Sequence, residues 1–244
     1  MEYKGSSAYD EEPFFQQYIS RRTRHNSPNN LIESPIFMKL LDEVNEKVVL
    51  DLGCGDGSFG LELLNLGCKL YVGVDGSENM FKLARVKLKG TNHKLHHCNL
   101  ETFDYPVNQF DIVTSRLVLH YIEDLEHVLG KVYQSLKIGG QFIMSVQHPI
   151  LTSSSKSTEQ GEKRTDWVVD DYFISGRRVE PWIGEKVVKY HRTIEEYFTT
   201  LQKAGFIIEN LHEGAPDRRF FDSQEEYNRR KRIPLFLIVK CRKG

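Results

Sequence analysis

Residues 48–57 read Val48-Val49-Leu50-Asp51-Leu52-Gly53-Cys54-Gly55-Asp56-Gly57, and this stretch decides the fold. An apolar run leads directly into a glycine-rich turn, and a helical pattern follows from Ser58. Glycine permits backbone conformations and close approaches that side chains forbid, and the amide groups at a helix start can face a ligand. The stretch therefore predicts a buried strand, a ligand-binding loop and a helix. Asp51, just ahead of the first glycine, would repel a pyrophosphate and would suit a ligand that carries an ammonium group.

A second acid ends the next predicted strand, where Val74 is followed by Asp75-Gly76-Ser77. An acid at this position can accept hydrogen bonds from both ribose hydroxyls of a nucleoside. Residues 55–60 also match the dinucleotide fingerprint G-x-G-x-x-G, so nicotinamide binding is an alternative. The offset of the glycines argues against it, because the glycine that closes the strand is Gly53 and the third glycine position then falls on Ser58. A further alternative is that both acids only cap turns.

Short β-rich runs alternate with helical ones along most of the chain. Several of the β-rich runs are continuously apolar, as expected for strands buried on both faces of a parallel sheet. The alternation predicts an α/β fold with a doubly wound, seven-stranded, mostly parallel sheet. Thr193 and Glu196 have the spacing of a capping box at a helix start. The predicted strands are Val48–Leu52, Leu70–Val74, Lys94–Cys98, Phe110–Thr114, Gln141–Val146, Phe206–Leu211 and Leu235–Lys240, and the predicted helices are Ser58–Leu66, Ser77–Leu88, Leu125–Leu136 and Thr193–Ala204.

Two segments depart from this alternation, and we expect both to belong to one domain of residues 1–244. Residues 10–42 are interpreted as an N-terminal helical cap of two helices, broken near Pro28. Residues 147–192 form an insert after the fifth strand, with a polar start and an aromatic remainder. Alternation over residues 167–173, followed by Ser175-Gly176, predicts a β-hairpin there. A long insertion at the carboxyl end of a strand lies where α/β sheets bind ligands, so it is interpreted as either a lid or simple packing.

Composition excludes several classes of function. The 244 residues carry 33 Lys and Arg against 34 Asp and Glu, a formal net charge of -1, so no basic excess indicates nucleic acid. The local run Arg229–Arg232 is interpreted as a solvated helix end. Cys54, Cys68, Cys98 and Cys241 form no Cys-x-x-Cys pair, so neither a metal nor a dithiol site is expected. No apolar run approaches the roughly 20 residues of a membrane helix, so no membrane partner is expected. We expect a reducing, cytoplasmic location.

Four segments resemble motifs of the class I S-adenosylmethionine-dependent methyltransferases. VVLDLGCGDGSFG (48–60) resembles their first motif, GVDGS (73–77) the second, FDIVTSRLVLHYIED (110–124) the fourth, and LKIGGQFIMSV (136–146) the segment leading into the fifth strand. The order and spacing of these segments make the resemblance specific. The most similar group is the small-molecule branch (methyltransferase type 11-like), whose members methylate quinone precursors, metabolites or natural products. The resemblance implies a Rossmann-like methyltransferase fold, S-adenosylmethionine as cofactor and a small-molecule methyl acceptor.

The resemblance also implies roles for individual residues. Asp51, Gly53 and Gly55 would line the methionine end of the cofactor, and Asp75 would hold the ribose hydroxyls. The family often has an acid after the third strand that reaches the adenine amine, and here Asn99 stands at that position. The expected cofactor-binding residues are Asp51, Gly53, Cys54, Gly55, Asp75, Gly76, Ser77, Met80, Asn99, Leu100, Glu101 and Arg116, together with Tyr18 and Arg22, which share a helix face and could close the pocket.

A weak methyl acceptor also needs a base, and histidine titrates near working pH. The candidates are His120, His148 and His191. His148 is favoured because it directly follows the fifth strand, and strand carboxyl ends form the site. Any single histidine of this kind is more often a packed or capping residue than a base.

The alternatives to a small-molecule methyltransferase are an NAD-dependent oxidoreductase on a similar sheet and a non-catalytic cofactor-binding module. Nucleic-acid substrates are disfavoured because residues 114–117 read Thr-Ser-Arg-Leu, in place of the Asp/Asn-Pro-Pro-aromatic motif of base amino-methylation. The acceptor, the methylated atom and the oligomeric state are left open.

The aromatic insert gives one further expectation. Trp167, Tyr172, Trp182 and Tyr190 offer apolar area with polar handles for a flat acceptor. We expect the insert to cover the cofactor's methyl group, with a flexible polar hinge at Ser153–Ser157.

Overall fold

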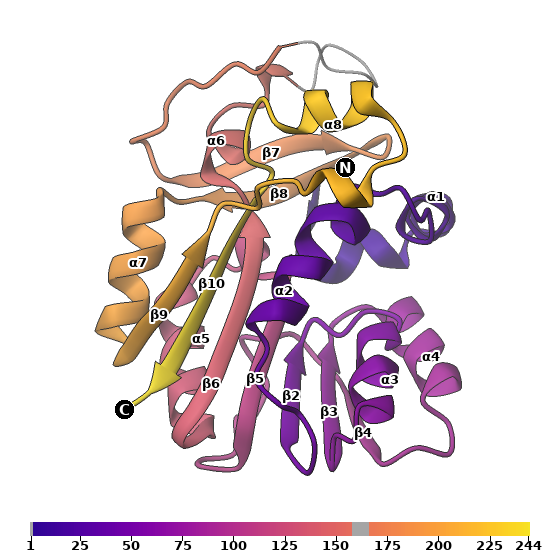
Figure 1. The fold of residues 1–244 in the computed structure, drawn as a ribbon, viewed down its shortest axis with the longest axis vertical. Coiled ribbons are helices and arrows are strands. Elements are labelled where there is room, and N and C mark those ends of the chain that lie inside the picture. The colour runs from indigo at the N-terminus through magenta and orange to yellow at the C-terminus, as the bar shows by residue number, and fades with distance from the viewer. Residues whose placement is uncertain (1, 158–165) are drawn as a thin grey trace.

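The main sheet has seven strands, and in Figure 1 it lies below the layer that contains β7 and β8. The computed structural model describes residues 2–157 and 166–244. The strand order is β4-β3-β2-β5-β6-β10-β9, with parallel pairing from β4 to β6 and antiparallel pairing of β10 with both of its neighbours. This confirms the predicted α/β class with a mostly parallel sheet. The strands are β2 (Val48–Leu52), β3 (Leu70–Asp75), β4 (His93–His97), β5 (Phe110–Arg116), β6 (Leu136–Gln147), β9 (Phe206–His212) and β10 (Phe236–Lys243).

Helices cover both faces of this sheet, so its central strands are buried on both sides. One core cluster includes Leu129 and Leu201, and the other includes Phe37 and Leu63. Thr193 forms the predicted capping box with Glu196. Among the described residues no helix is long and apolar enough to cross a bilayer. The covering helices are α2 (Ser34–Leu40), α3 (Ser58–Asn65), α4 (Glu78–Lys87), α5 (Leu125–Ser135) and α7 (Ile194–Lys203).

A second layer lies over the carboxyl ends of the parallel strands (Figure 1). It contains a small sheet in which β8 pairs parallel with β1 and antiparallel with β7. The N-terminal and insert segments therefore share one sheet, although they are far apart in sequence. The elements of this layer are β1 (Glu2–Lys4), η1 (Gly5–Asp10), α1 (Glu12–Arg22), the π-helical turn η2 (Asn29–Glu33), the short helix η3 (Leu119–Tyr121), α6 (Pro149–Ser153), β7 (Gly176–Trp182), β8 (Glu185–His191), η5 (Arg218–Phe220) and α8 (Gln224–Arg230).

The predicted hairpin exists, but not where the sequence pattern put it. Residues 167–173 form no strand, and the hairpin is β7–β8, which turns at Ile183 and Gly184. Both turn residues have positive φ, of 52° and 82°. A two-residue turn with two positive φ values matches the twist of a hairpin, and its usual sequence is Asn-Gly. Because Ile183 stands in place of the usual asparagine, the sequence does not show the Asn-Gly pattern of such a turn.

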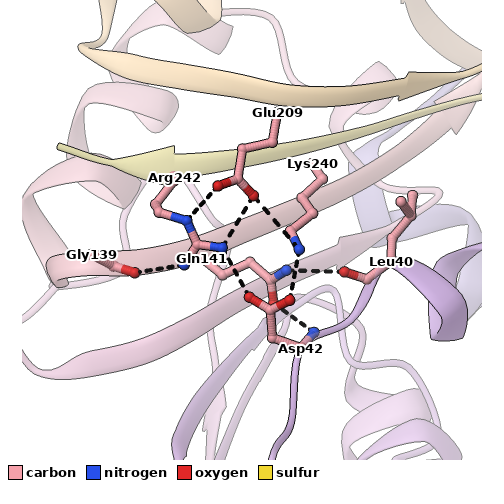
Figure 2. Close-up of polar contacts among 7 residues, drawn as sticks. All are labelled: Leu40, Asp42, Gly139, Gln141, Glu209, Lys240 and Arg242. Atoms are coloured by element: carbon pink, nitrogen blue, oxygen red, sulfur yellow. Dashed lines mark hydrogen bonds and ion pairs between the residues drawn. The ribbon is translucent and has the colours of Figure 1, made fainter.

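An ion-pair network joins the end of α2 to the antiparallel edge of the sheet (Figure 2). Asp42 accepts hydrogen bonds from Lys240 Nζ at 2.7 Å and from Arg242 Nη2 at 3.0 Å. Arg242 Nη2 also donates to Glu209 on β9 at 3.1 Å. Gln141 Nε2, at the start of the regular part of β6, donates to Leu40 O at 3.0 Å. These contacts fix the chain between α2 and β2 against β6, β9 and β10.

Candidate functional site

A cavity of about 380 Å³ lies where the carboxyl ends of β2, β3 and β5 meet the second layer. This volume falls within the range of small-molecule and cofactor sites. The walls come from the glycine loop, the ends of the strands, and the segments of residues 4–33 and 116–123. Of the predicted cofactor residues only Ser77 is not in the wall. Those that line the cavity are Tyr18, Arg22, Asp51, Gly53, Cys54, Gly55, Asp75, Gly76, Met80, Asn99, Leu100, Glu101 and Arg116.

The glycine loop needs Gly53 for two independent reasons. Its φ is 75°, in the left-handed region that favours glycine. A Cβ atom there would also lie 2.2 Å from Val118 Cγ2, so a side chain would collide with the loop that follows β5. The amides of Gly53 and Cys54 both donate to Val74 O, at 2.8 and 3.0 Å. The loop is thereby held against the end of β3.

Asp51 is a buried carboxylate held by side chains. It is 2% exposed, and it accepts hydrogen bonds from Tyr71 Oη at 2.7 Å and Thr114 Oγ1 at 2.8 Å. Burial raises the pKa of Asp51, and these two hydrogen bonds oppose that rise. A carboxylate has about four acceptor sites, so two bonds leave capacity for a ligand. The interpretation of Asp51 as a turn cap is wrong, because both partners are side chains on neighbouring strands.

Asp75 both caps its turn and lines the cavity. Its Oδ2 accepts from Gly55 N at 2.8 Å and its Oδ1 from Ser77 N at 2.9 Å. Burial raises the pKa of Asp75 to about 6, although these two hydrogen bonds favour the charged form. Ser77 lies behind the wall and caps α4, since its Oγ accepts from Met80 N at 3.2 Å. Asp75 therefore does cap its turn, as the alternative proposed, but it also lines the cavity.

The wall near Arg116 contains a buried ion pair. The Arg116 guanidinium donates from Nε and Nη2 to the two carboxylate oxygens of Glu33, with the Nε–Oε1 distance at 3.1 Å. Ser145 Oγ donates to Glu33 Oε1 at 2.7 Å. The guanidinium carbon also lies 5.1 Å from the centroid of Phe37 and 4.7 Å from that of Phe59. Sequence reasoning missed Glu33, because nothing in the spacing along the chain relates it to the strand that carries Arg116.

Leu117, the next residue, has a left-handed backbone with φ 60°. Its amide donates to Ser145 O at 2.9 Å, and its side chain lines the cavity. A bulky residue in this region stores strain, which tends to occur at functional sites. Leu117 therefore belongs to the site wall as well as to the core.

Four tyrosines line the cavity: Tyr9, Tyr18, Tyr121 and Tyr190. The rings of Tyr9 and Tyr18 are nearly perpendicular, with centroids 4.8 Å apart. Burial raises the pKa of Tyr9 well above its usual value and raises that of Tyr18, so both stay protonated. Tyr190 Oη donates to Glu123 Oε2 at 2.8 Å, and burial raises the pKa of Tyr190 to about 12. Of these four, Tyr18 was predicted as a cofactor-binding residue and Tyr190 as part of the acceptor wall, whereas Tyr9 and Tyr121 were not predicted.

The three predicted histidines are not among the described residues that line the cavity. His148 caps α6 through Nδ1, which accepts from Ile150 N at 3.2 Å, and its Nε2 lies 3.2 Å from Glu213 Oε1. His191 Nδ1 lies 2.7 Å from Thr152 Oγ1. His120 Nδ1 accepts from Gln147 N at 3.4 Å. Burial lowers the pKa of all three rings, and their role as general base stays a prediction that this geometry does not support.

The insert contributes to the site mainly by packing against residues that line the cavity. Trp182 packs on Tyr9, Phe14 and Tyr18, with ring centroids 6.1, 5.5 and 5.8 Å away. Trp167 instead lies under Arg232, 4.9 Å from its guanidinium carbon. The two ends of the predicted hinge, Ser153 and Ser157, are buried, whereas Lys156 between them is exposed. Residues 158–165 lie outside the described residues, so the expected opening of the insert stays a prediction.

Comparisons with known proteins agree with this geometry. A family model described as a methyltransferase domain matches residues 50–144. A crystal structure of an S-adenosylmethionine-dependent methyltransferase from Mesorhizobium loti superposes with a TM-score of 0.80 at 30% identity, covering 89% of this chain and 99% of that one. A Listeria monocytogenes structure assigned to the same class has a TM-score of 0.80 at 34% identity, covering 87% and 96%. The demethylmenaquinone methyltransferase of Lactococcus lactis is 28% identical over 178 residues, 70% of this chain and 69% of its own.

Proposed function

Because this chain belongs to the S-adenosylmethionine-dependent methyltransferases, we propose that it transfers the methyl group of that cofactor to a small-molecule acceptor. The observation that carries the proposal is the lining of the cavity. Its wall combines the glycine loop, Asp75 and Asn99 with the tyrosines Tyr9, Tyr121 and Tyr190. The polar groups of the first set fit the cofactor, and the tyrosines offer a contact surface for an acceptor.

The cofactor, when bound, supplies an electrophilic methyl group, and the protein must align the acceptor and exclude water. Asp75 and Asn99 fit the ribose and adenine, while Asp51 and Arg22 fit the ammonium and carboxylate of the methionine part. The Glu33–Arg116 ion pair and the strained Leu117 hold the wall beside it. Preorganised groups of this kind act by positioning, so no large movement of the sheet is needed.

The tyrosines in the cavity wall favour an acceptor with both flat and polar parts. Buried phenol rings give apolar contact area with a hydroxyl at the edge. Glu123 lines the cavity, and the hydrogen bond from Tyr190 orients its carboxylate, so Glu123 is the candidate for taking a proton from the acceptor. A small acceptor is favoured over a macromolecule because η1 and α1 form part of the cavity wall, through residues that include Tyr9 and Tyr18. The quinone precursor named for the Lactococcus relative is one acceptor of this size class.

The test uses methyl-labelled S-adenosylmethionine with a fractionated cell extract. We expect label in the low-molecular-weight fraction, and Tyr190→Phe should lower transfer while the Kd for S-adenosylhomocysteine stays unchanged. Tyr133→Phe, on α5 and away from the cavity, is the matched control and should behave like wild type. Label found only in protein or nucleic acid would contradict the small-molecule proposal. Saturable NAD binding without any response to S-adenosylmethionine would contradict the activity as a whole.

A further inference from the structure

Residues 2–10, here called the strap, form part of the cavity wall next to the Asp75–Gly76 turn. The strap consists of β1 and η1, and its residues Lys4, Gly5, Ser6 and Tyr9 line the wall. None of these residues was predicted to bind the cofactor, since the cofactor motifs begin only at residue 48. The strap therefore adds a wall from outside the motif-bearing part of the chain.

The strap lies so close to the Asp75–Gly76 turn that a side chain at position 76 would collide with it. A Cβ atom on Gly76 would lie 2.4 Å from Ser6 Oγ, 3.2 Å from Ser6 Cβ and 2.7 Å from Asn99 Oδ1. Gly76 is not among the glycines with positive φ, so the turn itself would accept a side chain there. Glycine at position 76 therefore makes room for the strap and for Asn99. The strap therefore lies directly beside Gly76, in the turn that presents Asp75 to the cavity.

Asp10 fastens the end of the strap to the start of α4. Its Oδ1 accepts hydrogen bonds from Ser77 Oγ at 2.7 Å and from Asn79 N at 3.1 Å. Asn79 Nδ2 donates in return to Tyr9 O at 3.2 Å. Ser77 is fully buried and directly follows the Asp75–Gly76 turn. Asp10 therefore connects the strap to the same turn that presents Asp75 to the cavity.

The other end of the strap is fastened to the insert. Glu2, Tyr3 and Lys4 pair in parallel with residues 186–188 of β8, and Glu2 forms an ion pair with Arg177 on β7. The strap is thus held at both ends, by β8 and by α4, and it crosses the cavity between them. The attachment at Asp10 depends on few hydrogen bonds, whereas β1 adds a strand to a sheet.

We propose that the strap is a gate over the bound cofactor and that Asp10 is the positioning residue that holds it closed. The cofactor and its demethylated product exchange when Asp10 releases Ser77 and Asn79. This extends the proposed function from methyl transfer to cofactor exchange, and it rests on that function only for the identity of the cofactor. It does not depend on which acceptor is methylated.

The first test measures dissociation of S-adenosylhomocysteine by stopped-flow chase. Asp10→Ala removes two hydrogen bonds to a charged acceptor, so we expect the dissociation rate to rise by roughly tenfold or more. Asp10→Asn keeps one oxygen acceptor and should restore most of the slow release. The matched control is Asp124→Ala, which removes the side-chain cap of α5, where Asp124 accepts from His127 N at 3.0 Å. Asp124→Ala should destabilise α5 about as much as Asp10→Ala destabilises α4, but it should leave the dissociation rate unchanged.

The second test locks the strap with a disulfide between Ser6→Cys and Gly76→Cys. The 3.2 Å separation of the Ser6 Cβ and a Cβ at position 76 is close to the roughly 3.5–4.5 Å of a disulfide. When the pair is oxidised around bound S-adenosylhomocysteine, the product should survive gel filtration and be released on reduction. Gly76→Cys alone brings the same Cβ within 2.7 Å of Asn99 Oδ1 and should release the product under both conditions.

Two results would overturn the gate. One is an unchanged dissociation rate in both Asp10→Ala and Asp10→Asn, and the other is equal exchange from the oxidised and reduced double-cysteine protein. Failure to find any small-molecule acceptor would contradict the proposed function but would not alter these rates. The two proposals can therefore fail separately.

Discussion

Among single residues, those that follow a strand along the chain were predictable, and those brought in from elsewhere were not. Asp51, Asp75 and Asn99 stand at strand ends, and parallel strands carry their carboxyl ends to one edge. Glu33 and Tyr9 reach the same cavity through contacts between distant segments, which spacing does not encode. His148 also follows a strand, yet its ring caps α6. Position at a strand end therefore predicts the edge of the sheet but not the direction of the side chain.

The raised pKa of Asp75 makes cofactor affinity depend on pH. In the free protein burial raises this pKa to about 6, with nearby Asp51 and Asp10 adding to the rise. Ribose hydroxyls favour the charged carboxylate, so the Kd for S-adenosylhomocysteine should increase as the pH falls below about 6. The rise should approach tenfold per pH unit, measured by calorimetry between about pH 5 and 7.5, where the ligand's own groups titrate little.

Asp75→Asn should bind more weakly and lose this dependence on pH. The weaker binding of the wild type at low pH is not explained by acid unfolding caused by Asp75. A raised carboxyl pKa contributes stability that is present at low pH and lost as the pH rises through about 6. A wild-type Kd that stays constant down to pH 5 would show that Asp75 does not bind in its charged form.

At the level of elements, apolar continuity and glycine punctuation located β2, β3 and β5 to within two residues. The insert was less predictable, because alternation over residues 167–173 resembles a strand that has no neighbour to pair with. The real hairpin, β7–β8, contains a buried ion pair. Lys189 Nζ lies 2.6 Å from Glu180 Oε2 and 2.7 Å from Gln147 Oε1. The pair lies between the insert and the end of β6.

Breaking this ion pair should destabilise the protein strongly. Lys189→Met leaves Glu180 buried and unpaired, and we expect the free energy of unfolding to fall by about 3–5 kcal/mol. The exposed neighbour Lys186→Met is the control and should change it by less than about 0.5 kcal/mol. Combining Lys189→Met with Glu180→Leu should recover much of the loss, since no charge then remains buried. Urea unfolding measures all three, and a double variant as unstable as the single one would contradict this explanation.

For the whole molecule, the cavity joins the two layers, because the sheet supplies Asp51 and Asp75 while the second layer supplies Tyr9, Tyr18 and Tyr190. The ion-pair network around Asp42 adds a further link between α2 and the sheet (Figure 2). A ligand that contacts both layers stabilises them together. The predicted single domain of residues 1–244 should therefore unfold as one unit, both with and without cofactor.

Calorimetry tests this expectation directly. We expect one transition whose calorimetric and van't Hoff enthalpies agree. S-adenosylhomocysteine at 100 times its Kd adds about 2.7 kcal/mol, which for a chain of this length raises Tm by roughly 5–11 °C. NAD at the same concentration should leave Tm unchanged. If the second layer were a separate unit, the scan would show two transitions, and a ligand held by the sheet alone would move only one of them.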